Sequence, residues 1–421
     1  MKRIRTTGHL NATVRVPGSK SITQRMLITA FLAKGETVLR NALLSEDTSC
    51  LMEALRLLGA QIEHTAGRIT ITGTGGTVQN PGKPILMGNN GTAMRFLTTL
   101  TTLGRGTFTI DGSTRLRERP VKPLLDALGA LGATAHGHDG RGRPPVTVQA
   151  AGTLRGGTVT FTDIDSSQYV SSLLLAAPCS GKGIAIMLEG ATVSMPYVDM
   201  TIDVMNRFGV SVASEENRFL VTAPQWYRAS DHVIEGDLSS ASYFFLAAAI
   251  RGGTVRVLNV GTGSRQGDRR FLDILSDLGC RITRCAEWIE VTGVKLHRGD
   301  RCYDMADMPD MVPSLAVLAA YREGTTMIER VAHLRKKESD RLRALACELN
   351  RIGITVREKA DGLEITGGAP RGTTIRTYDD HRIAMSFAVA GLVTEGMDIE
   401  NEGCVEKSFP GFWTEMEKLY G

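Results

Sequence analysis

Seven cations near predicted helix starts are the residues of this chain best suited to chemistry. They are Lys20, Arg25, Arg119, Lys337, Arg341, Arg382 and Lys407. A cation close to a helix start opposes the helix dipole, so several such placements suggest that anions bind there. Arginine binds carboxylate or phosphate through a planar fork, and lysine acts as a point charge. The group therefore predicts a site for two anionic substrates, although each side chain taken alone could simply be solvated.

Two carboxylates close to these cations, Asp310 and Glu338, are candidates for proton transfer. A neighbouring cation keeps a carboxylate ionised, as a base requires, whereas burial raises its pKa toward that of an acid. Either residue could instead be a helix cap or a salt-bridge partner. The segment PGSKS (17–21) is not interpreted as a nucleotide-binding loop, because the first glycine of that motif is absent.

The elements that must position these residues repeat along the chain. One series of glycines follows helix-like runs and precedes strand-like runs: Gly35, Gly106, Gly183, Gly253, Gly324 and Gly396. A second series interleaves with the first: Gly59, Gly132, Gly209, Gly279 and Gly353. Glycine after the last helical turn supplies a left-handed cap, so both series are predicted to mark helix ends. The spacing predicts an α/β protein with six repeats of roughly 72 residues, longer than the usual solenoid period.

Helix starts and hairpins follow from the same spacing. Fifteen residues before the glycines of the first series stand Lys20, Gly91, Gln168, Leu238, Pro309 and His381. Their surroundings are small and polar, which is typical of helix starts. Alternating segments joined by polar turns predict β-hairpins at 61–73, 211–223, 281–293 and 355–367. Each repeat is thus a helix, a strand, a helix and a strand pair.

The repeats also suggest a division into domains. The last repeat lacks a hairpin, and the strand-like segment 4–16 is predicted to fill its place. An even split gives one domain of residues 18–235, with repeats 1–3, and a discontinuous domain of residues 1–17 and 236–421, with repeats 4–6. The stretch 137–145 is predicted to be a loop, and His136, His138 and Asp139 there are expected to be solvated rather than to bind a metal.

Composition narrows the class of protein. The 421 residues are 42% hydrophobic and 22% charged, as expected for a soluble protein of two or three domains. The net charge of +4 gives no case for nucleic-acid or membrane binding, and the apolar runs are too short to span a bilayer. Seven cysteines without a CxxC pair predict free thiols in a reducing cytoplasm. We expect a monomer.

Ten motifs occur in order along the whole chain: PGSKS, GNNGTAMR, RERP, SSQ, PYVDM, EGDLSSASYF, PD, KESDR, YDDHR and KSFP. Together they resemble the 5-enolpyruvylshikimate-3-phosphate synthase family of enolpyruvyl transferases. The resemblance implies a two-domain, inside-out α/β barrel. In that fold each domain holds three repeats of a βαβαββ-type unit around a pseudo-threefold axis, and the chain crosses between the domains twice.

The resemblance also implies an activity in aromatic amino acid (chorismate) biosynthesis. The enolpyruvyl group of phosphoenolpyruvate would move to the 5-hydroxyl of shikimate 3-phosphate by addition and elimination through a tetrahedral intermediate, with release of phosphate. Asp310 would take the hydroxyl proton, Glu338 would protonate the methylene carbon, and Lys20 would assist. No metal or other cofactor is expected.

Site residues carry over by motif. Shikimate 3-phosphate is implied to contact Lys20, Ser21, Arg25, Ser166, Ser167, Gln168, Ser194, Tyr197, Asp310, His333 and Lys337. Phosphoenolpyruvate is implied to contact Lys20, Asn89, Gly91, Arg119, Gln168, Arg341, Arg382 and Lys407. The domain 18–235 would lie mainly on the shikimate 3-phosphate side, and the other domain would supply Asp310, Glu338, Arg341, Arg382 and Lys407.

Two positions depart from the family pattern. Phe96 stands where many relatives carry proline, and His333 stands where some carry asparagine. The resemblance further implies that a side chain at Gly91 would crowd phosphoenolpyruvate and the competing herbicide glyphosate, of which these enzymes are the target.

Two rival functions differ in what they require. Enolpyruvyl transferases acting on UDP-N-acetylglucosamine share the fold but resemble a pattern with a reactive cysteine in a mobile loop, and DGSTRLRERP (111–120) contains none. A non-catalytic polyanion-binding scaffold would need extended basic stripes, which the small net charge disfavours.

Overall fold

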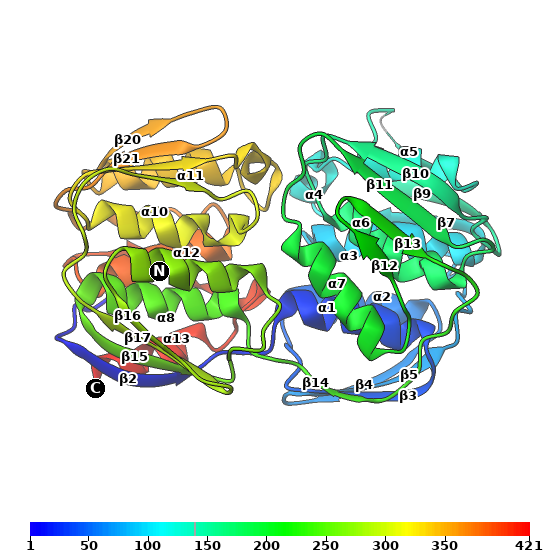
Figure 1. Cartoon of the computed structure of the whole chain (residues 1–421), viewed down its shortest axis with the longest axis horizontal. Coiled ribbons are helices and arrows are strands. Elements are labelled where there is room, and N and C mark those ends of the chain that lie inside the picture. The colour runs from blue at the N-terminus through cyan, green and yellow to red at the C-terminus, as the bar shows by residue number, and fades with distance from the viewer. Residues whose placement is uncertain (139) are drawn as a thin grey trace. The chain divides into compact units, whose positions relative to one another are not determined.

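The computed structural model describes residues 1–138 and 140–421, so Asp139 of the predicted loop lies outside the described residues. The chain forms two compact α/β units (Figure 1). The continuous unit is Gly18–Ile234, and the discontinuous unit combines Met1–Pro17 with Glu235–Gly421. Each unit has its own hydrophobic core.

The described strands of the continuous unit form three sheets. They are β3 (Lys34–Arg40), β4 (Gln61–Thr65), β5 (Arg68–Thr74), β6 (Ile85–Leu86), β7 (Arg105–Asp111), β8 (Thr134–Gly137), β9 (Val146–Ala151), β10 (Gly157–Thr162), β11 (Ile184–Glu189), β12 (Ala213–Glu215), β13 (Arg218–Val221) and β14 (Asp231–Val233). The sheet orders are β14-β3-β5-β4, β6-β7-β9-β8 and β10-β11-β13-β12. In each sheet the edge strand that is named first pairs in parallel with its neighbour, and the other two pairs are antiparallel.

The discontinuous unit repeats this arrangement in two of its three sheets, and its third sheet has only three strands. Its described strands are β1 (Lys2–Arg3), β2 (Leu10–Arg15), β15 (Gly253–Leu258), β16 (Arg281–Arg284), β17 (Trp288–Gly293), β18 (Arg301–Asp304), β19 (Thr325–Glu329), β20 (Thr355–Glu358), β21 (Leu363–Thr366), β22 (Thr374–Ile375) and β23 (Asp398–Ile399). The sheet orders are β2-β15-β17-β16, β18-β19-β21-β20 and β1-β23-β22.

Inner helices fill the centre of each unit. They are α1 (Lys20–Leu32), α3 (Gly91–Leu100) and α6 (Gln168–Ala176) in the continuous unit, and α8 (Leu238–Arg251), α10 (Val312–Ala320) and α12 (His381–Gly391) in the discontinuous unit. Nearly every residue of these helices is buried, including polar residues of α1 and α3. Helices α8, α10 and α12 lie side by side (Figure 1).

Outer helices pack with one face against the inner ones. They are α2 (Glu46–Leu57), α4 (Thr114–Glu118), α5 (Lys122–Ala130), α7 (Pro196–Arg207), α9 (Phe271–Asp277), α11 (Arg341–Arg351) and α13 (Phe412–Glu417). Short 3₁₀ turns join elements at η1 (Thr101–Leu103), η2 (Ala177–Cys179), η3 (Gly267–Arg270), η4 (Pro309–Met311), η5 (Ala332–Lys336), η6 (Glu402–Lys407) and η7 (Lys418–Tyr420). None of the described helices has the length and apolar character needed to cross a membrane.

The predicted helix starts and hairpins are confirmed. Helices α1, α3, α6, α8 and α12 begin at the predicted residues, and η4, which leads into α10, begins at Pro309. The predicted hairpins are β4–β5, β12–β13, β16–β17 and β20–β21.

The two glycine series play different structural roles. Each glycine of the second series lies two residues after the end of an outer helix with a positive φ, so the predicted left-handed cap is confirmed. The glycines of the first series also have positive φ angles after the ends of inner helices, but only Gly253 lies two residues beyond its helix and the others lie further on. Gly35 and Gly106 lie within β3 and β7, and Gly253 begins β15. Their φ angles of 97–108° let the chain turn from the preceding helix end into the strand.

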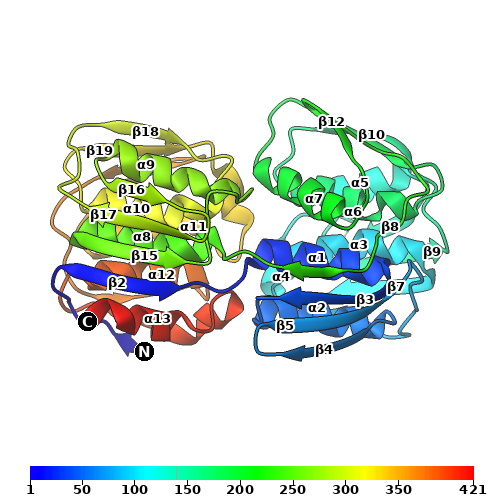
Figure 2. The same ribbon diagram turned by 60° about the horizontal axis from the view of Figure 1, so that its bottom comes forward.

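The prediction for segment 4–16 also needs correction. Only the first residues of the chain complete the last repeat, because β1 pairs with β23 and the Ile4 N–H donates to the Met397 carbonyl at 2.9 Å. The longer strand β2 instead pairs in parallel with β15 of the fourth repeat (Figure 2). Similarly, β14 pairs with β3 of the first repeat. Each of these strands belongs to the unit that the chain is about to leave, which explains where the two units are divided.

Candidate active site

The candidate residues form one set in each unit. The continuous unit holds Lys20, Ser21, Arg25, Asn89, Gly91, Arg119, Ser166, Ser167, Gln168, Ser194 and Tyr197, and the discontinuous unit holds Asp310, His333, Lys337, Glu338, Arg341, Arg382 and Lys407. In both sets the residues lie at or near the starts of inner helices or just before outer ones.

Arg25 is a buried cation whose described hydrogen bonds all go to neutral groups. Its side chain, 1% exposed, donates from Nε to Thr201 Oγ1 at 2.7 Å and from Nη1 to the Ser21 carbonyl at 2.9 Å. Nη2 donates to the Tyr197 carbonyl at 3.2 Å and to Ser171 Oγ at 3.3 Å. Burial lowers the pKa of Arg25 to about 10. Because its charge is not offset by these partners, Arg25 is suited to binding an anion.

Aromatic rings flank the Arg25 guanidinium. Its Cζ lies 5.4 Å from the centre of the Phe96 ring and 5.9 Å from that of Tyr197. Such cation–π contacts stabilise a desolvated guanidinium. Phe96, which departs from the family pattern, is therefore buried in α3 beside a candidate anion-binding residue.

Lys20, the first residue of α1, is ion-paired with a residue that the sequence did not single out. Its Nζ lies 3.0 Å from Oδ2 of Asp47, a buried residue in the first turn of α2. The Asp47 carbonyl accepts a hydrogen bond from Asn90 Nδ2 at 2.8 Å. Asp47 thereby connects the start of α1 to the N-cap of α3.

Gly91, Asn89 and Arg119 lie together. Arg119 is 3% exposed, and its Nη1 donates to the Asn89 carbonyl at 3.4 Å. A Cβ atom on Gly91 would lie 2.6 Å from Nη1 and 2.7 Å from Nη2 of Arg119. Any side chain at position 91 would therefore displace this guanidinium.

Gln168 is held in place by Arg95, which the sequence prediction missed. Arg95 Nη1 donates to Gln168 Oε1 at 2.6 Å and to the Gly91 carbonyl at 3.2 Å. The Gln168 amide in turn donates to Thr92 Oγ1 at 2.8 Å. Arg95 lies in the same GNNGTAMR motif as Gly91, one helical turn later, and that spacing was the available signal.

The serines of this set surround the starts of two helices. Ser166 Oγ accepts a hydrogen bond from the Gln168 N–H at 3.3 Å, and Ser167 is the buried N-cap of α6. Ser194 is buried before α7 with a φ of 60°, and its carbonyl accepts from the Tyr197 N–H at 3.1 Å.

In the discontinuous unit, the catalytic candidates share one arginine. Arg341, the first residue of α11, donates from Nη1 to Asp310 Oδ1 at 3.0 Å and from Nη2 to Glu338 Oε2 at 2.8 Å. The structure thus brings Asp310 and Glu338 to the same guanidinium. Both are salt-bridge partners, the alternative that the sequence left open, and this role is compatible with proton transfer.

Asp310 also pairs with Arg382. Nη2 of Arg382 donates to Asp310 Oδ2 at 2.7 Å, and its Nη1 lies 3.4 Å from the Tyr243 hydroxyl oxygen. Burial by itself would raise the pKa of Asp310, but the charges of Arg382, Arg341 and Lys337 together lower it below the usual aspartate value. Asp310 is therefore held in its ionised form.

Asp380 anchors this network and was missed from the sequence. It is fully buried, and its Oδ2 accepts from Arg341 Nε at 2.8 Å and from Ser339 Oγ at 2.9 Å. Its Oδ1 accepts from the Arg382 backbone N–H at 3.0 Å, which caps α12. Asp380 belongs to the YDDHR motif, immediately before the predicted helix start, so its position as a cap was the available signal.

The remaining candidates of this unit are Lys337, His333 and Lys407. Lys337 lies close enough to Asp310 to lower the pKa of that carboxyl. His333 is buried in η5, and Lys407 is the buried last residue of η6, shortly before α13.

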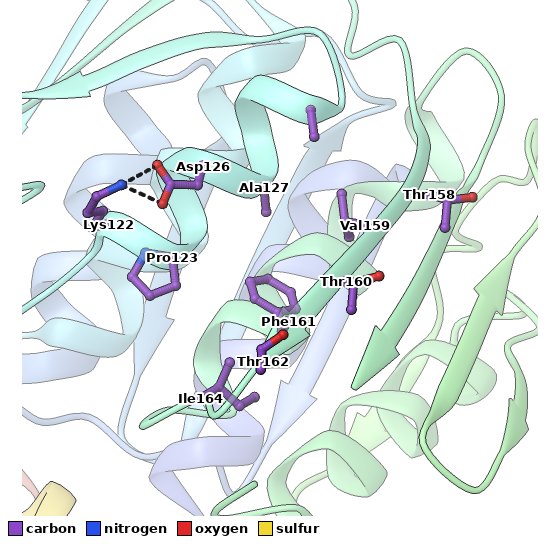
Figure 3. Close-up of a pocket in the computed structure, with 11 residues that line it drawn as sticks. Lys122, Pro123, Asp126, Ala127, Thr158, Val159, Thr160, Phe161, Thr162 and Ile164 are labelled. Atoms are coloured by element: carbon purple, nitrogen blue, oxygen red, sulfur yellow. Dashed lines mark hydrogen bonds and ion pairs between the residues drawn. The ribbon is translucent and has the colours of Figure 1, made fainter. Parts of the chain in front are cut away.

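Two hollows elsewhere lack the character of an active site. One of about 450 Å³ lies between α5 and β10, and its charged pair, Lys122 and Asp126, is exposed and self-neutralised (Figure 3). The other, about 520 Å³, lies along α11 and includes Arg376 and Tyr378. Neither is lined by a candidate residue. Within the described ranges, the His, Cys, Asp and Glu side chains form no cluster of three that could hold a metal ion.

Comparisons with known proteins agree with the motifs. Residues 4–416 match the model of the family described as EPSP synthase (3-phosphoshikimate 1-carboxyvinyltransferase). The chain belongs to the EPSP synthase family. A relative from Syntrophobacter fumaroxidans named 3-phosphoshikimate 1-carboxyvinyltransferase is 44% identical over 99% of both chains. Another of that name, from Methanothermobacter thermautotrophicus, is 41% identical over 98% of this chain and 97% of its own.

A solved structure places the fold in the same family. The EPSP synthase from Acinetobacter baumannii matches with a TM-score of 0.82 at 28% identity, over 99% of this chain and 97% of that one. The predicted enolpyruvyl transferase fold is confirmed. So is the predicted activity class: the chain is an enzyme of enolpyruvyl transfer in the shikimate pathway. The alternative acceptor, UDP-N-acetylglucosamine, is not favoured.

Proposed function

We propose that this enzyme transfers the enolpyruvyl group of phosphoenolpyruvate to the 5-hydroxyl of shikimate 3-phosphate and releases phosphate. The observation that carries the proposal is the network in which Arg341 and Arg382 hold Asp310, with Glu338 on the same Arg341. It combines two buried cations for an anionic substrate with two carboxylates for proton transfer. The relatives named 3-phosphoshikimate 1-carboxyvinyltransferase support the choice of acceptor.

Asp310 is proposed as the base for the 5-hydroxyl. Paired with two arginines it is a weak base, because their charges lower its pKa. The carboxylate and phosphate groups of phosphoenolpyruvate would compete for Arg341 and Arg382. As those guanidiniums turn toward the substrate, the pKa of Asp310 rises and the carboxylate becomes able to take the proton. In this way, substrate binding would activate the base.

Glu338 is proposed as the acid, because it loses its paired cation and can carry a proton when Arg341 turns toward the substrate. It would give a proton to the methylene carbon of phosphoenolpyruvate while the 5-oxygen attacks the neighbouring carbon, which produces the tetrahedral intermediate. In the elimination step the Glu338 carboxylate takes a proton back from the new methyl group and the carbon–phosphate oxygen bond breaks. Fixed cations stabilise the charge of the departing phosphate, and Lys20 is proposed to assist.

The remaining candidates are proposed to bind substrate. Arg25, with Ser21 and Tyr197 around it, would bind shikimate 3-phosphate, and its uncompensated burial supports this role. The other proposed contacts of that substrate are Lys20, Ser166, Ser167, Gln168, Ser194, Asp310, His333 and Lys337. The proposed phosphoenolpyruvate contacts are Lys20, Asn89, Gly91, Arg119, Gln168, Arg341, Arg382 and Lys407.

We propose that the enzyme works as a monomer in the cytoplasm without a metal or other cofactor. The described cysteines form no disulfide, which supports a reducing compartment. Addition and elimination at the enol ether need an acid, a base and fixed cations, and the residues named above supply these groups.

Release of phosphate tests the proposed reaction. The purified chain is incubated with phosphoenolpyruvate and either shikimate 3-phosphate or UDP-N-acetylglucosamine, with added chelator in parallel samples. We expect phosphate release only with shikimate 3-phosphate, and no effect of the chelator. Phosphate release only with UDP-N-acetylglucosamine would reject the proposed acceptor. No release with either acceptor would reject it as well.

A further inference from the structure

Asp268 is a buried carboxyl group that the proposed mechanism does not use. It lies in η3 of the discontinuous unit, and the residue is 6% exposed. Its Oδ2 accepts a hydrogen bond from Ser239 Oγ in the first turn of α8. Among the described residues, its buried Oδ1 has no hydrogen-bond partner and no lysine or arginine pairs with it. An ionised carboxylate is costly in such a place, and the neutral acid is much less so.

The charges around Asp268 have the same effect. The carboxylates of Asp310, from η4, and Asp237, the N-cap of α8, face it, against one cation, Arg382 of α12. Arginines on its own element are engaged elsewhere: Arg269 Nη1 donates to the Ser264 carbonyl at 3.1 Å, and Arg270 Nη1 donates to Asp307 at 3.3 Å.

Burial first, and then the charge of Asp310, raise the pKa of Asp268 to about 7. The Ser239 hydrogen bond and the charge of Arg382 act in the opposite direction. Because this pKa is raised, Asp268 keeps its proton below about pH 7 and loses it as the pH rises further. A second negative charge then appears beside Asp310 and Arg382.

We propose that Asp268 is a positioning residue that controls how strongly Arg382 binds an anion. When Asp268 is neutral, less negative charge faces Arg382, and Arg382 binds an incoming phosphate or carboxylate more strongly. When Asp268 is ionised, the added negative charge attracts Arg382 and repels the anion. The inference rests on the proposed function, in which Arg382 binds phosphoenolpyruvate.

The test compares the wild type with Asp268→Asn, which mimics the neutral acid at every pH. KM for phosphoenolpyruvate and kcat are measured between pH 6 and pH 8.5. The ratio of the two KM values, wild type to variant, cancels the ionisation of the substrate itself. We expect a ratio near 1 at pH 6 that rises to about tenfold at pH 8.5, with little change in kcat. A ratio that stays constant across this range would overturn the inference.

Two further variants separate the inference from folding defects. Ser239→Ala removes the hydrogen bond that favours the ionised form, so it should move the midpoint of the wild-type KM rise to higher pH. An unchanged or lower midpoint would contradict the proposal even if Asp268→Asn does not fold. Asp273→Asn, which removes an exposed carboxylate of α9 that pairs with Arg284 at 2.5 Å, is the control and should leave the KM profile unchanged.

The failure of the proposed function would look different. A wild type that releases no phosphate from phosphoenolpyruvate and shikimate 3-phosphate would reject the function itself. An active wild type whose KM ratio to Asp268→Asn does not change with pH would reject only the role of Asp268.

Discussion

Arg382 lies 2.7 Å from Asp310, with its Nη2 donating to Oδ2 of the carboxylate. The same carboxylate accepts from Arg341 at 3.0 Å through its other oxygen. Both carboxylate oxygens of Asp310 thus accept hydrogen bonds from arginines that we propose also bind phosphoenolpyruvate. We propose that this arrangement couples the protonation of Asp310 to the binding of the substrate.

Replacing Asp310, the proposed base, should lower kcat without raising KM for phosphoenolpyruvate. We expect Asp310→Asn to lower kcat by about 10²- to 10⁴-fold, the usual contribution of a general base. KM for phosphoenolpyruvate should not rise, because Arg341 and Arg382 lose a competing partner. Asp307→Asn, three residues earlier and paired with the exposed Arg270, is the control. Steady-state kinetics that showed kcat within twofold of the wild type would remove Asp310 from the mechanism.

The lowered pKa of Asp310 also predicts a pH dependence of stability. A depressed pKa adds stability that is fully present above the unfolded-state value of about 3.9 and is lost as the pH falls further. The wild type should therefore exceed Asp310→Asn in free energy of unfolding by a constant amount above about pH 4, and the difference should shrink at lower pH. Urea unfolding at several pH values measures it. A difference that grows on acidification would contradict the ion pairs described here.

A side chain at position 91 should act through Arg119. Gly91→Ala places a methyl group against the Arg119 guanidinium, which must move away. Loss of one charged contact predicts a rise of about 10- to 100-fold in KM for phosphoenolpyruvate. Inhibition by glyphosate should weaken as well.

The matched control for this variant is Gly129→Ala, in the exposed face of α5. A Cβ there would meet nothing within 4 Å among the described atoms. That variant should keep the wild-type KM for phosphoenolpyruvate and the wild-type inhibition by glyphosate. It should also gain about 0.5–1 kcal/mol of stability from helix propensity. Equal glyphosate inhibition of Gly91→Ala and the wild type would count against the placement of Gly91 at the substrate.

The N-terminal segment should be needed by the discontinuous unit. Deletion of residues 1–16 removes β2 from β15 and β1 from β23, together with the paired hydrogen bonds of Arg3 to Asp398 at 2.8 and 2.9 Å. We expect residues 235–421 to lose protection from hydrogen exchange. The substitution Arg15→Gln, on the exposed side of β2, should keep that protection. A truncated protein with unchanged melting would refute the role of this segment.

Local signals predicted the scaffold well for identifiable reasons. Small polar residues such as Asn90 and Asp237 cap helices through their own side chains. The starts of α3 and α8 can therefore be predicted from the local sequence. Outer helices end two residues before glycines such as Gly59, which adopts a φ that other residues avoid. These choices depend on neighbours in the chain and can be inferred from it.

Contacts between segments that are distant in the sequence were harder to predict. The pairing of β2 with β15 joins residues more than 240 positions apart, and nothing in the segment 4–16 specifies which sheet edge it joins. Asp380 looked like an ordinary helix cap, because its second role, anchoring Arg341, depends on a residue 39 positions away. Asp47, Arg95 and Asp268 were missed for the same reason. Asp47 and Arg95 contact site residues only in the folded chain, and only there does Asp268 feel the charges of Asp310 and Arg382.

The division of proton transfer between Asp310 and Glu338 has one sharp test. The reaction is run in D2O, and deuterium in the carboxyvinyl methylene of the product is measured by mass spectrometry or NMR. If Glu338 protonates that carbon, the wild type should place deuterium there, and Glu338→Gln should lose both incorporation and turnover while still binding shikimate 3-phosphate. Product that carries no deuterium at this carbon, or equal incorporation by Glu338→Gln, would contradict the mechanism.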